Sequence, residues 1–175
     1  CENNHCYDIS KRGYINLLLN PDKATNNPGD SKESLVARKA YLNKGYYDPI
    51  LNQVITCIDE FKHQDDLSIL DLGCGEGYYT QGLKKHFENS DIYGLDISKI
   101  AIATRYRKDV TWLVGNSKNI PILDHSLDFI CALFTVVNQD ELKRALKEDG
   151  YIVHVTANNQ HLIEIKELIY DEIKV

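Results

Sequence analysis

The sequence predicts an α/β fold in which helices cover both faces of one open, mostly parallel β-sheet. Short apolar runs alternate with helical patterns over residues 67–173, and a glycine-rich turn joins the first such run to the first such helix. Alternation of this kind is typical of parallel sheets. Because crossovers between parallel strands are right-handed, the topology is expected to be doubly wound.

The first 62 residues are expected to lie outside this alternating pattern. Residues 1–31 are rich in Asn, Asp, Gly and Pro and are interpreted as a loop-rich lead-in. Residues 32–62 are expected to form a helical linker or cover, with Gly45 ending its first helix. Its two helices are expected from a cap at Ser31 or Asp30 to about Lys44, and from Tyr47 or Asp48 to Phe61.

Residues 63–175 are expected to form the α/β domain itself. Its strands are short apolar runs bounded by turn residues, and its helices are longer segments with apolar residues at helical spacing. Asp149-Gly150 is expected to end the helix before the last strand. The expected strands span 67–72, 91–95, 110–114, 127–134 and 151–155, and the expected helices span 77–87, 98–107, 139–146 and 162–173.

Composition and charge argue against several classes of protein. No apolar run approaches the roughly 18 residues that a membrane-spanning helix needs, so we expect no membrane partner. The net charge of −6 does not indicate a general nucleic-acid binder. Five scattered cysteines fit reduced thiols better than a disulfide framework, and no secretory leader opens the sequence. A cytoplasmic location is therefore expected.

The turn after the first strand carries the strongest chemical signal in the chain. It reads Asp71-Leu72-Gly73-Cys74-Gly75-Glu76-Gly77. Glycines permit a tight turn and a close approach of the backbone to a ligand. Ligands of open α/β sheets bind beyond the carboxyl ends of the strands. Asp71 and Gly73 are therefore candidate ligand-binding residues.

Two further strand ends add polar groups beside this turn. Asp96 follows the second strand, 25 residues after Asp71, and a carboxylate there suits a pair of ribose hydroxyls. Asn116 follows the third strand and can accept a hydrogen bond from the amino group of adenine. Ile97 and Ser117, which come next in the chain, are assigned to the same ligand site.

The glycine spacing separates two kinds of adenosine-containing ligand. Dinucleotide-binding turns follow G-x-G-x-x-G, which suits a pyrophosphate at a helix N-terminus. Here the spacing is G-x-G-x-G and Tyr78 comes next. The carboxylate of Asp71 would repel a pyrophosphate but suits a cation. The pattern therefore favours S-adenosylmethionine, which carries a sulfonium and an ammonium group.

Shorter motifs extend along the whole chain. In order they are Cys1-x-x-x-His5, Tyr7-Asp8, Lys11-x-Gly13-Tyr14, Pro28-Gly29-Asp30-Ser31, Ala37-Arg38, Gly45-x-Tyr47-x-Pro49, Leu70-Asp71-x-Gly73-Cys74-Gly75-Glu76-Gly77-Tyr78-Tyr79 and His161-Leu162. In this order they resemble the large-subunit (23S) rRNA guanine-N1 methyltransferases, the RlmA family. The resemblance implies a Rossmann-like class I methyltransferase fold, S-adenosylmethionine as cofactor and 23S rRNA as substrate. It also implies a further C-terminal region beyond Val175 and a link to macrolide resistance.

The resemblance implies additional cofactor contacts, position by position. These fall on Tyr47, on Gly75 and Glu76 of the turn, and on His161 after the last strand. The chain also departs from the family after the fourth strand. A Pro is common there, whereas this chain has Phe134-Thr135-Val136.

A structural zinc ion is a second cofactor implied by the resemblance. The family holds this ion through a CxxC pair and a later Cys and His. Only the later pair is matched here, by Cys1 and His5. Because a structural zinc site needs four ligands, residues 1–31 are interpreted as a partial zinc-binding module.

The implied reaction acts on N1 of guanine, which lies on the pairing edge of the base. The base must therefore be unpaired or flipped out of its stack. Arg38 is a candidate for contact with a cofactor carboxylate or an RNA phosphate. Lys39 is a second RNA candidate, although neighbours on a helix cannot both face one ligand. Tyr78 is a candidate for stacking on the base, and no general base is assigned.

Two alternatives stay open on sequence grounds. A class I methyltransferase acting on a small molecule would carry the same glycine turn and the same Asp96. A non-catalytic RNA-binding factor would keep cofactor binding without methylating any RNA. The oligomeric state also stays open, with a homodimer as one alternative.

Overall fold

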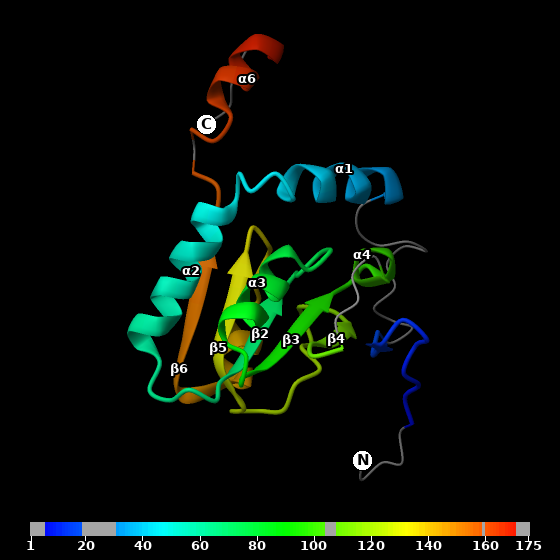
Figure 1. Cartoon of the computed structure of the whole chain (residues 1–175), viewed down its shortest axis with the longest axis vertical. Coiled ribbons are helices and arrows are strands. Elements are labelled where there is room, and N and C mark those ends of the chain that lie inside the picture. Colours follow the sequence, from blue (N-terminus) through cyan, green and yellow to red (C-terminus); the bar gives the residue numbers. More distant parts are fainter. Residues whose placement is uncertain (1–5, 19–30, 104–107, 159, 171–175) are drawn as a thin grey trace.

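The computed structural model contains the expected sheet and describes residues 6–18, 31–103, 108–158 and 160–170 (Figure 1). Its six strands are β1 (Tyr14–Asn16), β2 (Ser68–Leu72), β3 (Asp91–Asp96), β4 (Thr111–Val114), β5 (Leu127–Leu133) and β6 (Leu146–Val155). They lie in the order β1-β4-β3-β2-β5-β6, and all neighbouring pairs are parallel. The chain steps outward from β2 to β4 and then returns to the other side of β2. This order confirms the doubly wound topology, with the reversal between β2 and β5.

Helices cover both faces of this sheet, as expected for an α/β fold. The described helices are α1 (Lys32–Leu42), α2 (Asp48–Phe61), α3 (Tyr78–His86), α4 (Lys99–Ala103), α5 (Gln139–Ala145) and α6 (Ile163–Ile169). The predicted ends of the second of these helices, at Asp48 and Phe61, are confirmed. None of the helices in the described ranges is long and apolar enough to cross a membrane.

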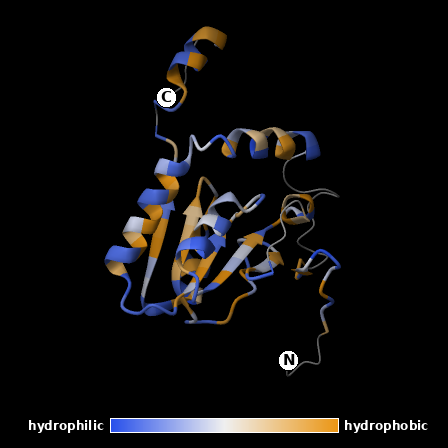
Figure 2. Cartoon of the chain, in the orientation of Figure 1, coloured by the Kyte–Doolittle hydropathy of each residue, from blue (hydrophilic) through white to orange (hydrophobic). Residues whose placement is uncertain are grey.

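The core has two layers because successive residues of a strand point to opposite faces of the sheet. In β2, Ile69 packs in one layer with residues of α2 and α3 such as Ile58 and Leu83. Leu70 packs in the other layer with Leu142 of α5. Figure 2 shows the apolar strands between these helices. The alternation also points Asp71 toward the face covered by α3, where it bonds to that helix.

The lead-in region contains a strand that the sequence did not predict. Residues 14–16 form β1 and pair with β4, with Tyr14 opposite Trp112 and Asn16 opposite Val114. The expected loop-rich lead-in therefore contains one short strand that was not predicted. A three-residue strand has no periodicity of its own, and its partner lies about 100 residues further along the chain.

The last strand starts earlier than expected. Helix α5 ends at Ala145 and β6 begins at Leu146, so Asp149-Gly150 lies inside the strand and does not end a helix. Leu127 pairs with Leu146 while Phe129 pairs with Tyr151, so the residues between them form a bulge. Glycine and aspartate are tolerated in such a bulge because its residues leave the regular ladder.

Two helices lie beyond the carboxyl ends of the strands. Figure 1 shows α1 crossing above the arrowheads of the sheet and α6 projecting away from the body of the molecule. Helix α1 buries Leu35 and Leu42, whereas α6 buries none of its residues. The predicted cap of α1 is confirmed, because the side chain of Ser31 accepts a hydrogen bond from the backbone N–H of Ser34 at 3.1 Å. The predicted extensions of α4 to residue 107 and of α6 to residue 173 end outside the described residues.

Candidate active site

The glycine turn connects β2 to α3 at the carboxyl end of the sheet. Its glycines 73, 75 and 77 have φ angles of +72°, +55° and +83°, a conformation that side chains disfavour. The backbone N–H groups of Gly73 and Cys74 donate to the carbonyl oxygen of Leu95 at 2.8 and 3.0 Å. A Cβ atom at Gly77 would lie 2.5 Å from the ring of Trp112. The turn is therefore tight, fixed to β3 and dependent on glycine.

Asp96 holds this turn from the end of β3. Its Oδ2 accepts a hydrogen bond from Gly75 N–H and its Oδ1 accepts one from Ser98 N–H, both at 2.8 Å. A carboxylate has about four acceptor positions, so one side chain at this strand end can accept several hydrogen bonds at once. The side chain is half-buried, which leaves it accessible from the rim of the sheet.

Asp71 is a buried carboxyl group at the end of β2. It is 1% exposed and accepts a 2.5 Å hydrogen bond from Thr80 Oγ1 of α3. The pKa of Asp71 is raised from 3.8 to about 7. Burial is the main cause, the Thr80 hydrogen bond opposes it, and the charges of Asp96 and Glu76 add to the increase. A carboxyl group in such surroundings favours the approach of a cation.

A cleft of about 340 Å³ opens over Asp71 and the glycine turn. Its floor is the turn, including Glu76, which is 2% exposed. Three aromatic side chains stand along its walls in a continuous series: the ring of Tyr41 lies 6.0 Å from that of Tyr47, which lies 6.1 Å from that of Phe134. The lining residues are Arg38, Tyr41, Leu42, Tyr47, Asp71, Gly73, Cys74, Gly75, Glu76, Tyr78, Tyr79, Leu133 and Phe134.

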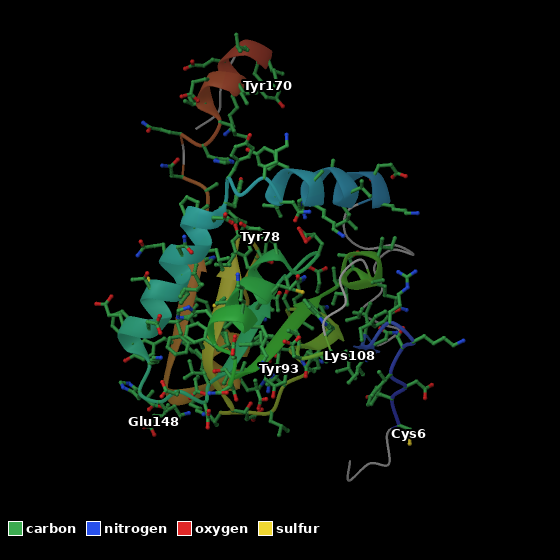
Figure 3. All side chains as sticks on the ribbon, in the orientation of Figure 1. Cys6, Tyr78, Tyr93, Lys108, Glu148 and Tyr170 are labelled. Atoms are coloured by element: carbon green, nitrogen blue, oxygen red, sulfur yellow. The ribbon has the colours of Figure 1, made fainter. Side chains whose placement is uncertain are left out.

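Seven of the residues expected to form the site meet in this cleft. Five predicted cofactor residues line it, as do Arg38 and Tyr78 from the RNA candidates. Tyr78 stands at the start of α3, below α1 (Figure 3), and its hydroxyl donates to Asp48. Burial raises the pKa of Tyr78 to about 12, with Asp48 adding to the shift. The five cofactor residues are Tyr47, Asp71, Gly73, Gly75 and Glu76.

The predicted adenosine contacts lie beside the cleft, on the side of β3 and β4. Asp96 is opposite Val114 in the sheet, and Gly115 N–H donates to the Asp96 carbonyl oxygen at 3.0 Å. Asn116 follows directly, and its Oδ1 accepts from Lys118 N–H at 3.0 Å. Ile97 and Ser117 are both half-buried at these strand ends.

Other predicted residues lie away from the cleft or outside the described part of the chain. Lys39 is not among the lining residues, which agrees with its position beside Arg38 on the helix. His161 is exposed in the turn between β6 and α6 and does not line the cleft. Cys1 and His5 fall outside the described ranges, and within those ranges no three His, Cys, Asp or Glu side chains could together hold a metal. The zinc ion stays a prediction without support from the structure.

The structure adds Tyr41 and Phe134 to the site, since both line the cleft. Tyr79, a further stacking candidate from the sequence, also lines it, and its hydroxyl is buried without a hydrogen-bond partner. Phe134 had one signal in the sequence, since it comes directly after a predicted strand end. Tyr41 had none, because the position of α1 above the sheet cannot be read from local pattern.

The acidic cleft fits a small cationic ligand, and the fold with this turn defines a methyltransferase domain. Residues 69–150 match the family model described as "Methyltransferase domain". A chain solved in complex with the Haloferax volcanii Trm112 methyltransferase activator shares the fold, with a TM-score of 0.60, 22% identity, and coverage of 81% of this chain and 68% of that one. Over residues 69–150 the chain therefore matches a methyltransferase domain in sequence, and it shares the fold of such a domain.

The names of similar curated proteins specify a substrate as well as a class of enzyme. YxjB of Bacillus subtilis, a candidate 23S rRNA (guanine-N(1)-)-methyltransferase, is 30% identical over 98% of this chain. The 23S rRNA (guanine(748)-N(1))-methyltransferase of Streptomyces fradiae is 28% identical over 97% of it. These matches confirm the resemblance to the rRNA guanine-N1 methyltransferases. The chain spans 62% and 61% of the length of these two relatives.

Proposed function

We propose that this protein transfers a methyl group from S-adenosylmethionine to N1 of a guanine in large-subunit rRNA. The observation that carries the proposal is that part of the cleft wall comes from residues before the methyltransferase domain match. The general methyltransferase match begins at residue 69, whereas Arg38, Tyr41 and Tyr47 come from the preceding segment. That segment is included in the similarity to the guanine-N1 methyltransferases, which covers 97–98% of the chain.

The residues of the cleft fit S-adenosylmethionine in charge. When bound, this cofactor supplies an electrophilic methyl group on a positively charged sulfur. Asp71 and Glu76 place carboxyl groups beneath the cleft, where they favour its ammonium and sulfonium charges. Arg38 is positioned to bind an anionic group, either the cofactor carboxylate or an RNA phosphate. Asp96 and Asn116 lie where ribose and adenine would extend toward β3 and β4.

The cleft also suits a base presented out of its helix. N1 of guanine takes part in base pairing, so the reactive atom is reachable only in an unpaired or flipped nucleotide. Loops of RNA present such bases, and proteins hold them by stacking on aromatic rings. The rings of Tyr41, Tyr47 and Phe134 provide aromatic surface beside the carboxylates of the floor.

Primer extension on methylated RNA tests this function directly. The protein is incubated with labelled S-adenosylmethionine and unmodified 23S rRNA, and the product is copied by reverse transcriptase. A methyl group on N1 blocks pairing, so a single stop one nucleotide before a guanine is expected.

Other results would assign the protein differently. Label transfer without a stop would place the methyl group away from the pairing edge. Cofactor binding without any transfer to RNA would favour a small-molecule methyltransferase or a non-catalytic RNA-binding factor.

A further inference from the structure

Phe134 stands at the carboxyl end of β5, level with the glycine turn. The two neighbouring strands β2 and β5 are paired so that Leu72 lies opposite Ala132. Cys74 and Phe134 each follow two residues later. Phe134 therefore reaches the cleft from the strand end next to the turn, and it is one of the lining residues.

The backbone holds Phe134 in a conformation that a non-glycine residue disfavours. Its φ angle is +56°, in the left-handed region. Its N–H donates a 2.8 Å hydrogen bond to the carbonyl oxygen of Val155 at the end of β6. The next side chain, Thr135, packs against Gly73, where it leaves no room for a Cβ atom. The corner is therefore fixed from both sides.

The ring of Phe134 is presented to solvent at the cleft. Phe134 is 45% exposed, whereas Ile130 and Ala132 of the preceding strand are fully buried. The ring of Tyr47 meets it edge to face, at 72° with 6.1 Å between centroids, an arrangement that aromatic pairs favour. Neither backbone strain nor an exposed aromatic ring stabilises the folded chain, and such features persist where a ligand uses them.

The position of Phe134 favours the substrate over the cofactor. The expected adenosine contacts, Asp96 and Asn116, lie on β3 and β4, to one side of the glycine turn. Phe134 lies on β5, to the other side. A cofactor whose adenosine reaches toward β4 directs its reactive end toward β2 and β5. The ring is therefore beside the place where the acceptor must arrive.

We propose that Phe134 is the platform on which the target purine stacks for methyl transfer. This inference rests on the proposed function, because it names the residue of the same cleft that orients the accepting base. Stacking on a fixed ring would hold the flat base in register with the methyl donor, and the rigid corner of β5 would prevent the ring from turning away.

Matched variants separate the ring from the backbone. Phe134→Leu keeps an apolar side chain at the same strained position but removes the flat ring, and Phe134→Tyr keeps the ring. Phe134→Gly relieves the left-handed strain and provides a ring-free variant if the Leu variant is unstable. Val136→Ala is the control, since Val136 is 83% exposed on the same segment and does not line the cleft.

Two quantities are measured for each variant: kcat/KM for methylation of unmodified 23S rRNA, and the Kd for S-adenosylmethionine by calorimetry. Phe134→Leu and Phe134→Gly are expected to lower kcat/KM by about 10- to 100-fold, the size of one lost base stack, with the cofactor Kd unchanged. Phe134→Tyr and Val136→Ala are expected to stay close to the parent protein.

Three results would overturn the inference. Near-normal RNA methylation by Phe134→Leu would show that the ring is not needed for the reaction, and the proposed function would stand. An equal loss of cofactor affinity would assign the ring to the cofactor. A parent protein that binds the cofactor and methylates no RNA would overturn the proposed function and this inference together.

Discussion

The two ends of the parallel sheet contain similar groups but use them differently. At the amino ends of the strands, Asp128 accepts from Ser68 N–H and pairs with Lys147, both at 2.8 Å. The rings of Phe129 and Tyr151 stack there at 5.7 Å. At the carboxyl ends, Asp71 and Glu76 line a cleft and Asp96 lies beside it. Arg38 is the one basic residue among the described residues that line this cleft.

The contrast teaches where function can be sought in a fold of this kind. Both ends have a hollow, of about 150 Å³ at the amino ends and about 340 Å³ at the carboxyl ends. At the amino ends Asp128 has Lys147 beside it, and the rings of Phe129 and Tyr151 stack on each other, at the end of the sheet where Figure 3 labels Glu148. At the carboxyl ends, acidic groups are concentrated around a glycine turn, and carboxyl groups clustered in a cleft in this way are typical of ligand-binding sites.

The largest expected effect comes from placing a side chain in the glycine turn. Gly77→Ala adds a Cβ atom 2.5 Å from the Trp112 ring at a φ of +83°. Left-handed strain of about 1–2 kcal/mol and overpacking of about 1–3 kcal/mol should together lower the free energy of unfolding by about 2–5 kcal/mol. Urea denaturation measures the change.

Gly75→Ala is the matched control for this prediction. At Gly75 the nearest atom is Arg38 Nη1, 4.0 Å from a Cβ, so only backbone strain of about 1–2 kcal/mol is expected. Equal losses for the two variants would show that contact with Trp112 does not decide the requirement for glycine.

The second expected effect concerns the ligand contacts of the carboxyl end. Asp96→Ala should weaken S-adenosylmethionine binding by about 1.5–3 kcal/mol, the value of hydrogen bonds to a charged group, or about 10- to 150-fold in Kd. Isothermal calorimetry on the folded variant measures it.

Asp128→Ala tests whether this effect is specific to one end of the sheet. Asp128 is the structural carboxylate of the opposite end, so its loss should lower stability and leave the cofactor Kd unchanged. A comparable loss of affinity in both variants would contradict the division between the two ends.

The third prediction uses the titration of Asp71. Its pKa in the folded protein is about 7, above its ordinary value of 3.8, so ionisation is completed only above neutral pH. Because a cationic ligand favours the ionised form, cofactor affinity should increase by up to about tenfold between pH 6 and pH 8.

The raised pKa of Asp71 also determines whether the free energy of unfolding rises or falls with pH. Between about pH 4 and pH 7 the unfolded chain loses the Asp71 proton while the folded chain keeps it, so this group lowers stability as pH rises through that range. Asp71→Asn should remove both dependences. A variant whose cofactor affinity still increases with pH would assign the titration to another group.

The smallest expected effect is at the amino end. Lys147→Ala removes a partly exposed ion pair with Asp128 and should cost about 0.2–1 kcal/mol of stability. The cofactor Kd should be unchanged. A shift in the urea midpoint measures the first quantity, and a change in Kd would show that the two ends of the sheet are coupled.

The parts of the fold that the sequence predicted are those determined by local pattern. The buried strand before Asp71 has a continuous apolar run, and the cap at Ser31 follows from the hydrogen-bonding capacity of its side chain. The glycine turn was predicted together with its neighbour Asp96, because both the residue types and the strand ends were visible in the sequence.

The parts that were missed depend on contacts between distant segments. β1 exists because β4 offers a free edge, and the bulge in β6 exists because β5 sets the register of its partner. The role of Phe134 in the cleft wall depends on the same kind of information. Its left-handed backbone is imposed by Val155 and Gly73, which lie 21 and 61 residues away in the chain.

The short strand β1 has a consequence for the chain as a whole. It covers the outer edge of β4, whose residues Trp112, Leu113 and Val114 are buried and apolar. An open edge of such a strand is a template on which other chains can add and aggregate. The first residues of the described chain therefore protect the sheet from self-association on that side, independently of any ligand.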